Sequence, residues 1–320
     1  MKNFNNSKLA WCLTDGSAGM ISQVKGLAEA LNLNYKLIQV ELKFPWSVLN
    51  PGYLPLSNFM FSKKMNISLE DKPDFIISCG KRSIYASLFY KRYFGKVFNI
   101  HIQNPRIHSS NFDLVVCPKH DNLNGTNILT TQLALNHITK ENLAKETENF
   151  KKLFSNIKKP ICTVMVGGKS RNFSFNKQEA IKLVSTLDHL FKKNDIHPII
   201  LFSRRTNNYI KDIFFDKFNN SNIIWTKNEN PYLALLSFSS FIVCTNDSVS
   251  MISEAISAKK SVYLYSLPSL KTNNRIEQFI KSITDNNMAR YLDNELKVYE
   301  NPYINETEQV ASLIYDRYSK

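Results

Sequence analysis

The stretch Phe241-Ile-Val-Cys-Thr-Asn-Asp-Ser-Val-Ser-Met-Ile-Ser-Glu254 decides the fold. Its first four residues are apolar, as in a buried strand of a parallel sheet, and a short polar turn follows them. The turn leads into a run with helical periodicity, in which Asn246 or Asp247 is placed to cap a helix that begins near Ser248. A strand that runs directly into a helix indicates an α/β fold.

The same alternation of strand and helix runs through the rest of the second half. The predicted strands are Ile161–Val166, Pro198–Phe202, Ile223–Trp225, Phe241–Cys244 and Val262–Tyr265. Five strands with helices between them fit one doubly wound domain.

The first half shows this alternation as well. Leu9–Leu13 leads through a glycine-containing turn into a helix at Met20–Leu31 and a strand at Tyr35–Leu42, which together form a βαβ unit. The other predicted elements of this half are the strands Phe75–Ser78, Val97–Ile102, Leu114–Cys117 and Asn127–Leu129 and the helix Ser83–Tyr93. We therefore predict two Rossmann-like, doubly wound α/β domains that face each other across a cleft.

A polar segment separates the two halves. The chain of 320 residues fits two domains, because a single core rarely grows beyond about 250–300 residues. Residues Lys140–Lys159 are rich in Lys and Glu and suit a helical connector. We place the N-terminal domain at residues 1–145 and the C-terminal domain at residues 146–320. The sequence leaves open on which of the two domains a last helix, Glu306–Tyr318, docks.

Composition limits the partners. The excess of 41 Lys and Arg over 27 Asp and Glu gives a net charge of +14, which favours anionic partners such as phosphates and anionic lipids. The basic residues are scattered and form no nucleic-acid motif, so we expect no nucleic acid partner. No apolar run is long enough for a signal peptide or a membrane span, and the five separate cysteines are typical of buried thiols in a reducing compartment. We expect a cytoplasmic protein with peripheral contact at the inner face of a membrane.

The helix that begins near Ser248 is the centre of the predicted donor site. Its free amides and positive dipole end favour an anion, and the hydroxyls of Ser248 and Ser250 add donors suited to a diphosphate. Glu254 lies one turn beyond Ser250 on the same face, where its carboxylate can accept both hydroxyls of a ribose. The structural alternative is that Asp247 only caps the helix and that Glu254 is a solvated surface charge.

Two further strand ends favour the ligand-binding interpretation. One strand runs into Gly167-Gly168-Lys169 and another into Ser203-Arg204-Arg205. Glycines let the backbone approach a ligand closely, and paired cations neutralise phosphate. The predicted donor and phosphate-binding residues are Gly167, Gly168, Lys169, Ser203, Arg204, Arg205, Thr245, Asn246, Asp247, Ser248, Ser250, Met251 and Glu254.

Two other nucleotide motifs do not fit. Gly168-Lys169-Ser170 looks like the end of a phosphate loop, but Thr163 stands where that loop needs a glycine. Gly16 and Gly19 give a G-x-x-G spacing and not the dinucleotide fingerprint, although Glu41 lies at the spacing expected of a ribose-binding acid. A Walker-type NTPase is rejected, and an NAD-binding protein is a weaker alternative.

The first strand-to-helix turn of the N-terminal half carries the predicted acceptor side. We expect its neighbour across the sheet to be the polar strand end Asn99–Arg106. Asp15 or His101 is placed to act as general base toward an acceptor hydroxyl; the structural alternatives are a helix cap for Asp15 and a hydrogen-bonded core histidine for His101. The predicted acceptor-side residues are Gly16, Gly19, Gln23, Gln103 and Arg106.

No metal site is predicted. His120-Asp121 follows a strand but has no partners at metal-ligand spacing, and the chain has no D-x-D pair of the kind that holds a divalent ion against a sugar diphosphate. We expect charge stabilisation by Lys169, Arg204, Arg205 and the helix end instead. A nucleotide-diphosphate sugar is the expected co-substrate, and no cofactor is expected.

The segment from Phe44 to Phe61, closed by Lys63-Lys64, is apolar and aromatic. It fits either a lid packed over the first domain or a segment that dips into a lipid interface. We favour the packed lid, because aromatic side chains in loops usually pack against something.

Several of these segments together resemble one known family, that of the plant mitochondrial-fission proteins named for elongated mitochondria and their bacterial relatives. The segments that carry the resemblance are Thr14-Asp15-Gly16 with Gly19 and Gln23, His101-Ile102-Gln103 with Pro105-Arg106, Phe112–Val116 with Pro118 and His120-Asp121, Ser203–Thr206, Asn230-Pro231-Tyr232, and Asp247–Met251 with Glu254-Ala255. The chain departs from the family pattern at Met20, where an asparagine is expected, and at Lys259-Lys260-Ser261, where a Gly-Pro type of turn is expected.

The resemblance implies a glycosyltransferase-B shape and a donor-binding helix that carries Asp247, Ser248, Ser250 and Glu254. Together with the predicted sites, it leads us to expect a metal-independent glycosyltransferase-like enzyme that moves a sugar from a nucleotide diphosphate to a membrane or envelope glycan acceptor. The alternatives are a nucleotide-sugar epimerase on the same fold and a non-catalytic adaptor of the mitochondrial-fission type.

Overall fold

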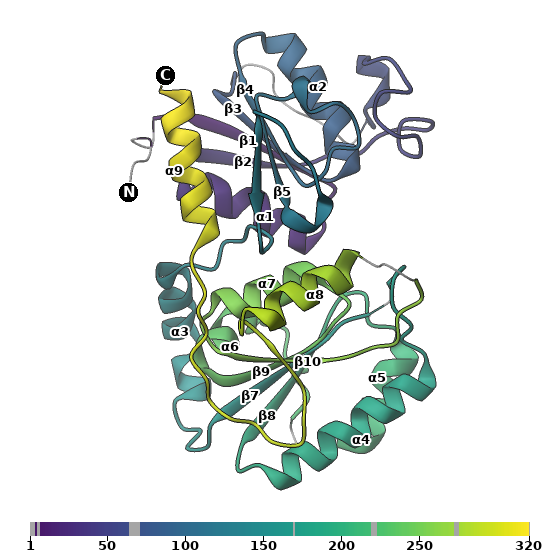
Figure 1. Ribbon diagram of the computed structural model, residues 1–320, viewed down its shortest axis with the longest axis vertical. Helices are drawn as coiled ribbons and strands as arrows, with labels where there is room; N and C mark the ends of the chain where they lie inside the picture. The colour runs from purple at the N-terminus through teal and green to yellow at the C-terminus, as the bar shows by residue number, and fades with distance from the viewer. Residues whose placement is uncertain are drawn as a thin grey trace. The chain divides into compact units, whose positions relative to one another are not determined.

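The computed structural model describes residues 4, 7–63, 71–168, 170–218, 223–271 and 275–319. The chain forms two α/β units, each built around one parallel sheet (Figure 1). The first unit contains Met1–His137 and Asn305–Lys320, and the second contains Ile138–Ile304. The predicted α/β class with two doubly wound sheets is confirmed.

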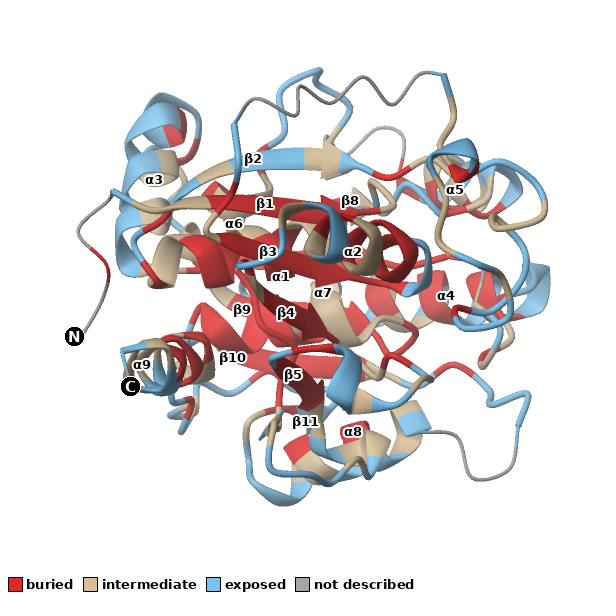
Figure 2. Cartoon of the chain, turned by 90° about the horizontal axis from the view of Figure 1, so that it is seen from above, coloured by how far each residue is buried: buried red, intermediate tan, exposed pale blue. Residues whose placement is uncertain are grey.

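The six-stranded sheet of the first unit is parallel throughout. Its strands, in order across the sheet, are β2 (Asn34–Gln39), β1 (Leu9–Thr14), β3 (Phe75–Cys79), β4 (Phe98–Ile102), β5 (Leu114–Pro118) and β6 (Ile128–Thr131). β1 and β3 are apolar runs because elements cover both of their faces. β2 lies at the edge and is largely exposed, as its colour shows in Figure 2.

Helices cover both faces of this sheet. α1 (Ala18–Ala30) and α9 (Glu306–Tyr318) pack on one face and α2 (Lys81–Phe94) packs on the other, and short 3-10 turns lie at Asn58–Met60, Ser109–Asn111 and Lys119–Asp121. Because side chains alternate along a strand, Cys12 of β1 joins the core under α1 and α9, whereas Trp11 packs edge-on against Tyr90 of α2.

The end of the chain returns to the first unit. The Glu306 carboxylate accepts hydrogen bonds from the backbone N–H groups of Gln132 (2.7 Å) and Leu133 (2.8 Å). The buried Ile314 side chain joins the core formed by α1 and the sheet. Figure 1 shows α9, in yellow, beside α1. The predicted last helix therefore docks on the first unit.

The five-stranded sheet of the second unit is also parallel. Its strands, in order across the sheet, are β11 (Arg290–Tyr291), β10 (Ser261–Tyr265), β9 (Ser239–Thr245), β7 (Ile161–Val166) and β8 (His197–Phe202). Its helices are α3 (Lys140–Phe154), α4 (Lys177–Lys193), α5 (Asn208–Phe218), α6 (Tyr232–Phe238), α7 (Val249–Ser257) and α8 (Arg275–Asp285). β7 is buried along its whole length, so it forms the centre of this unit's core.

Two features of the second unit differ from the sequence-based prediction. The predicted strand at Ile223–Trp225 is only a single bridge between Ile224 and Ile200, because Trp225 packs onto the α3 aromatics Phe150 and Phe154. β11 is the fifth strand instead. The predicted boundary at residue 145 falls inside α3, whose aromatic face packs into the core of the second unit.

The five cysteines are free and buried, as predicted. Burial raises the pKa of the Cys162 thiol to about 12, so this group holds its proton at neutral pH and is a poor nucleophile. Within the described ranges, no helix is both long enough and apolar enough to cross a bilayer.

We predict that Ile314→Ala lowers the free energy of unfolding of the first unit by about 2–5 kcal/mol, because it leaves a cavity between α9 and α1. Leu313→Ala is the matched control, since Leu313 is the preceding residue of α9 and is 48% exposed. Hydrogen exchange in increasing urea measures both units separately. Equal protection of α1 in the two variants would show that α9 does not stabilise the first unit.

Candidate functional site

In each sheet the first strand of the unit has the second strand on one side and the third strand on the other, so the strand order reverses there. In the second unit the chain passes from β7 to β8 on one side and then to β9 on the other. In open α/β sheets such a point leaves a crevice at the carboxyl ends of the strands, and ligands collect there. The segments that leave β7 and β9 at this point are Gly167-Gly168 and Thr245–Ser248, which are the segments predicted to bind the donor.

The carboxylate of Asp247 joins three strand ends. It accepts hydrogen bonds from the Gly168 backbone N–H (3.1 Å) after β7 and from the Thr245 hydroxyl (2.6 Å) at the end of β9. It also pairs with Arg205 after β8, with 3.3 Å between Nη2 and Oδ2. The Asp247 side chain is fully buried, so the carboxylate holds these loops in place and is not exposed to solvent.

The two glycines after β7 are required by the close packing of this network. A Cβ atom at Gly167 would overlap the Asp247 carboxylate, and one at Gly168 would overlap the backbone of Arg205. Thr206 completes the contact, because its hydroxyl donates to the Gly167 carbonyl (2.6 Å). The glycines were expected to let a ligand approach; the structure shows that they let neighbouring loops approach.

Burial dominates the ionisation of Asp247. Burial raises the pKa of this carboxyl group, while the Thr245 hydroxyl, the Gly168 amide and the Arg205 guanidinium act in the opposite direction. These donors are arranged to stabilise the ionised form. Two of these donors, Gly168 and Arg205, lie far from Asp247 in the sequence, and Thr245 lies close to it.

The structure corrects the predicted cap of α7. The N-cap is Ser248, and no side chain caps the helix. Asp247 is occupied by the network, and the Asn246 side chain accepts a hydrogen bond from the Leu267 N–H (3.0 Å) after β10. The first amides of a helix have no intrahelical partner. The first turn, Ser248–Met251, is partly exposed, and no side chain caps its N–H groups.

Glu254 lies farther along α7 and is almost buried, with 8% of its surface exposed. Its Oε2 atom accepts a hydrogen bond from the Tyr232 hydroxyl (2.6 Å) at the start of α6. Burial and the nearby Glu254 carboxylate both raise the pKa of Tyr232. The alternative that Glu254 is a solvated surface charge is therefore wrong. Sequence reasoning did not place Tyr232 in the site, although it lies in the Asn-Pro-Tyr segment of the family pattern.

The predicted cations of this site lie at the end of β8. Arg204 and Arg205 are exposed in the turn that Ser203 begins, where the Ser203 hydroxyl accepts a hydrogen bond from the Arg205 N–H (3.1 Å). Arg205 keeps about half of its side chain exposed (49%) while it contacts Asp247. Lys169 lies outside the described residues.

The first unit has a corresponding point between β1 and β3. Asp15 follows β1 there, is partly exposed, and accepts a hydrogen bond from the Ser17 N–H (3.0 Å) just before α1. Met20 packs over Gly80, where a Cβ atom would come within 2.5 Å of the Met20 sulfur. Met20 thus fills the space over Gly80, and it stands at the position where the family pattern has an asparagine.

The other predicted acceptor-side residues lie in the turns that follow β1 and β4 and in the first turns of α1. Gly16 lies in the same turn, with Gln39 behind it, and the buried Gln23 side chain donates to the Gly19 carbonyl (3.0 Å). Gln103 and Arg106 follow β4 and have left-handed backbones, with φ of 84° and 57°.

His101 is not beside Asp15. β3 lies between β1 and β4, which corrects the expectation that the two polar strand ends are neighbours. His101 is 1% exposed and its Nδ1 atom hydrogen-bonds with the Ser78 hydroxyl (2.9 Å). Burial lowers the pKa of His101 to about 3. This imidazole is a neutral, hydrogen-bonded core group, as in the structural alternative for His101. It is not exposed to solvent, where an acceptor could reach it.

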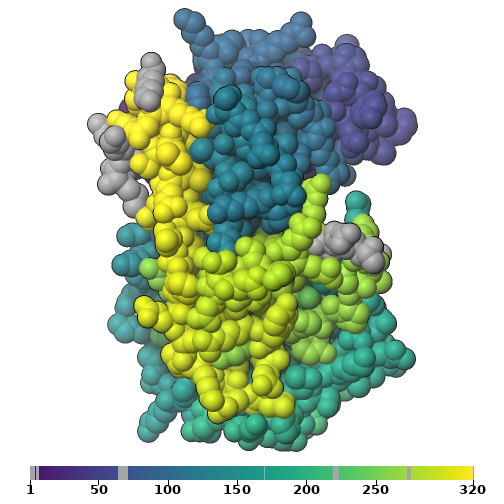
Figure 3. Space-filling model, viewed as in Figure 1, coloured from purple at the N-terminus to yellow at the C-terminus, as the bar shows by residue number. Residues whose placement is uncertain are grey.

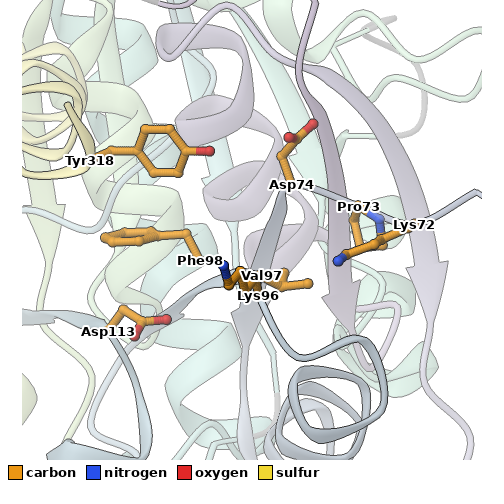
Figure 4. A pocket seen from close by; sticks show the side chains of 8 residues that line it. All are labelled: Lys72, Pro73, Asp74, Lys96, Val97, Phe98, Asp113 and Tyr318. Atoms are coloured by element: carbon orange, nitrogen blue, oxygen red, sulfur yellow. The ribbon is translucent and has the colours of Figure 1, made fainter.

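A cavity of about 500 Å³ lies at the opposite edge of the first sheet (Figure 4). Its lining residues Asp74 and Asp113 precede β3 and β5, so it lies at the amino ends of these strands. The two carboxylates are already paired, Asp74 with Lys8 and Asp113 with Lys91, each at 2.9 Å. These carboxylates stabilise the unit, and the cavity is separate from the residues predicted to act. No group of residues able to hold a metal ion occurs in the described part of the chain.

We predict that Gly167→Ala disorders the carboxyl ends of β7 and β9, because its methyl group and the Asp247 carboxylate cannot occupy the same space. Hydrogen exchange is expected to rise at Gly168, Thr245 and the start of α7. Gly125→Ala in the first unit is the control, since its nearest neighbour is the flexible end of Ile128 at 3.0 Å. Unchanged exchange around β7 in Gly167→Ala would contradict the described network.

Comparison with solved structures places this geometry in a known fold. The UDP-GlcNAc 2-epimerase of Methanocaldococcus jannaschii, in complex with UDP-GlcNAc and UDP, superposes with a TM-score of 0.57 at 14% identity, over 97% of this chain and 99% of that one. The MnaA–UDP structure from S. aureus gives a TM-score of 0.52 at 14% identity, over 98% and 97% of the two chains. The fold is therefore of the glycosyltransferase-B type, shared with nucleotide-sugar enzymes.

Sequence comparison finds two relatives. The uncharacterized protein RP120 of Rickettsia prowazekii is 27% identical over 95% of this chain and 97% of its own length. The mitochondrial fission protein ELM1 of Arabidopsis thaliana is also 27% identical, over 77% of this chain and 64% of that longer protein. The sequence profile of one family, mitochondrial fission ELM1, matches residues 18–318, which is nearly the whole chain. The chain therefore belongs to the mitochondrial fission ELM1 family.

Proposed function

We propose that the second unit binds a nucleoside-diphosphate sugar and that the protein transfers the sugar to a membrane or envelope glycan acceptor. The observation that carries this proposal is the uncapped first turn of α7, which follows β9 at the carboxyl ends of the neighbouring strands β7 and β9. Helix N-termini at such points favour phosphate, because free N–H groups and the helix dipole act together. The exposed Arg204 and the half-exposed Arg205 add positive charge at the end of β8, two strands from α7.

The proposed reaction needs a stabilised leaving group. The bond between the sugar C1 atom and the diphosphate oxygen breaks, and its electron pair goes to the nucleoside diphosphate. The first turn of α7 and the two arginines are suited to hold this negative charge without a metal ion. An acceptor hydroxyl forms the new bond to C1 and loses its proton to a base. Asp15 is our candidate for this base, as the partly exposed carboxylate after β1.

Glu254 is proposed to accept the ribose hydroxyls of the nucleotide. The Tyr232 hydroxyl donates to one of its oxygens and so fixes the carboxylate on α7. An oriented carboxylate loses less conformational freedom when it binds a diol. Glu254 lies one turn beyond Ser250, so one ligand can reach both the first turn and this carboxylate.

Epimerisation of a nucleotide sugar is the second candidate. The fold supports it, since the Methanocaldococcus jannaschii protein that superposes with a TM-score of 0.57 is a UDP-GlcNAc 2-epimerase. An epimerase returns an isomeric nucleotide sugar, whereas a transferase releases the free nucleoside diphosphate. Product analysis with an identified donor separates the two reactions.

We predict that a UDP-sugar binds to the full-length protein in calorimetry and raises its melting temperature, because a ligand that binds the native state stabilises it. GDP-, CMP- and ADP-sugars complete the panel. Glu254→Gln is expected to weaken binding about 10- to 100-fold, since hydrogen bonds to a charged group contribute about 1.5–3 kcal/mol.

Glu295→Gln is the matched control, because Glu295 is an exposed carboxylate of the same unit. It is expected to bind like the wild type. Absence of binding for every nucleotide sugar in the panel would contradict the proposal and favour a non-catalytic adaptor. Binding that Glu254→Gln leaves unchanged would place the nucleotide elsewhere.

A further inference from the structure

The loop between β2 and β3 exposes several large apolar side chains. Phe44, Tyr53 and Phe59 are 81%, 75% and 79% exposed, and Val48 and Leu49 are exposed beside them in the sequence. In the space-filling view, the violet segment around residue 50 forms a protrusion on the first unit (Figure 3). Water around so many aromatic rings is unfavourable, so such a face marks an interaction site.

The loop is held in a defined conformation. The Trp46 indole N–H donates to the Pro55 carbonyl (3.0 Å), and the Lys43 backbone N–H donates to the Met60 carbonyl (2.8 Å). From α2, the Tyr85 hydroxyl donates to the Asn50 carbonyl (2.6 Å). The exposed rings are therefore presented by an ordered backbone.

The predicted packed lid describes only part of this segment. Met60 is fully buried, and Phe61 stacks on Tyr90 of α2 with ring centroids 5.4 Å apart. These contacts fix the base of the loop on the first unit. Phe44 and Phe59 remain exposed above this base.

The part of the loop that carries the exposed rings, residues 43–63, has a positive charge. Residues 43–63 contain no Asp or Glu, and Lys43 and Lys63 are exposed at the two ends of this segment. Neither lysine forms an ion pair with any residue that the structure describes. Lys81 of α2 contacts the loop at another point, where its ammonium group donates to the Val48 carbonyl (2.6 Å). The apolar face therefore has a basic border.

We propose that this loop face, defined as Phe44, Val48, Leu49, Tyr53 and Phe59, inserts into the interface of an anionic phospholipid bilayer. Aromatic side chains are favoured at the level of the headgroups, and bordering lysines attract anionic lipids. The absence of carboxylates between Lys43 and Lys63 matches a negative surface better than a second copy of this basic chain. The proposal stands independently of sugar transfer.

Vesicle flotation of the full-length protein tests the proposal. Wild type is expected to float with phosphatidylcholine–phosphatidylglycerol vesicles and much less with phosphatidylcholine alone. The double variant Phe44→Ser, Phe59→Ser is expected to lose binding by about tenfold or more for each ring removed. Lys43→Gln with Lys63→Gln is expected to remove the preference for the anionic lipid. The matched control is Val298→Ser with Ile304→Ser, which replaces two exposed apolar side chains of the second unit.

Tryptophan fluorescence gives a second readout on the same samples. Trp46 lies in the loop and its emission is expected to shift to the blue with anionic vesicles, and Trp46→Phe is expected to abolish the shift. Two results would overturn the proposal. One is equal flotation of wild type and the double phenylalanine variant; the other is a wild-type dimer that becomes monomeric in this variant and never floats, which would make the face a self-association surface.

Discussion

The buried carboxylate of Asp247 is the constraint on which the second unit depends. It connects the ends of β7, β8 and β9 through Gly168, Arg205 and Thr245. A buried charge is costly unless donors surround it, and the loss of one partner from such a pair costs about 3–5 kcal/mol. Gly167 and Gly168 are explained by this network, since any side chain there would displace the carboxylate or the β8 turn. The first turn of α7 stays uncapped because Asp247 and Asn246 are used elsewhere.

The two units share a strand order but differ at the place where that order reverses. In the second unit the N-terminus of α7 lies at this place, and Arg204 and Arg205 lie at the end of β8, the strand next to β7. In the first unit Met20 packs over Gly80, and Asp15 is held by the Ser17 amide. This difference fits the assignment of the phosphate-binding role to the second unit. The exposed aromatic loop belongs to the first unit, so lipid contact and nucleotide binding are proposed for different units.

The strands were predictable wherever burial was continuous. β7 and β1 are apolar runs, and the sequence predicts their ends to within one residue. This is because almost all of their side chains are buried in the core of the sheet. The prediction of a strand failed at Trp225, because its ring packs against Phe154 of α3 and the segment forms no continuous strand. The helix α9 was predictable from its periodicity, but the unit on which it packs was not, because the hydrogen bond from the Gln132 N–H to the Glu306 carboxylate joins residues far apart in the chain.

The strand ends of the candidate site were predictable from the sequence, but the contacts of their side chains were not. Strand ends followed by polar turns identify the region around α7. The local rule that an aspartate before a helix caps it failed for Asp247, because Gly168 and Arg205 compete for the same carboxylate and lie far away in the sequence. The same limit applies to Tyr232, which reaches Glu254 from another helix. His101 has the residue type of a general base, but only the fold shows that it is buried against Ser78.

A crystal structure of the full-length protein with UDP tests the central claim most directly. We expect the diphosphate to lie within hydrogen-bond distance of the backbone N–H groups of Ser250 and Met251, with the ribose at Glu254 and the Asp247 network unchanged. An empty α7 N-terminus at saturating UDP, or UDP bound in the cavity at Asp74 and Asp113, would contradict the assignment of the donor site.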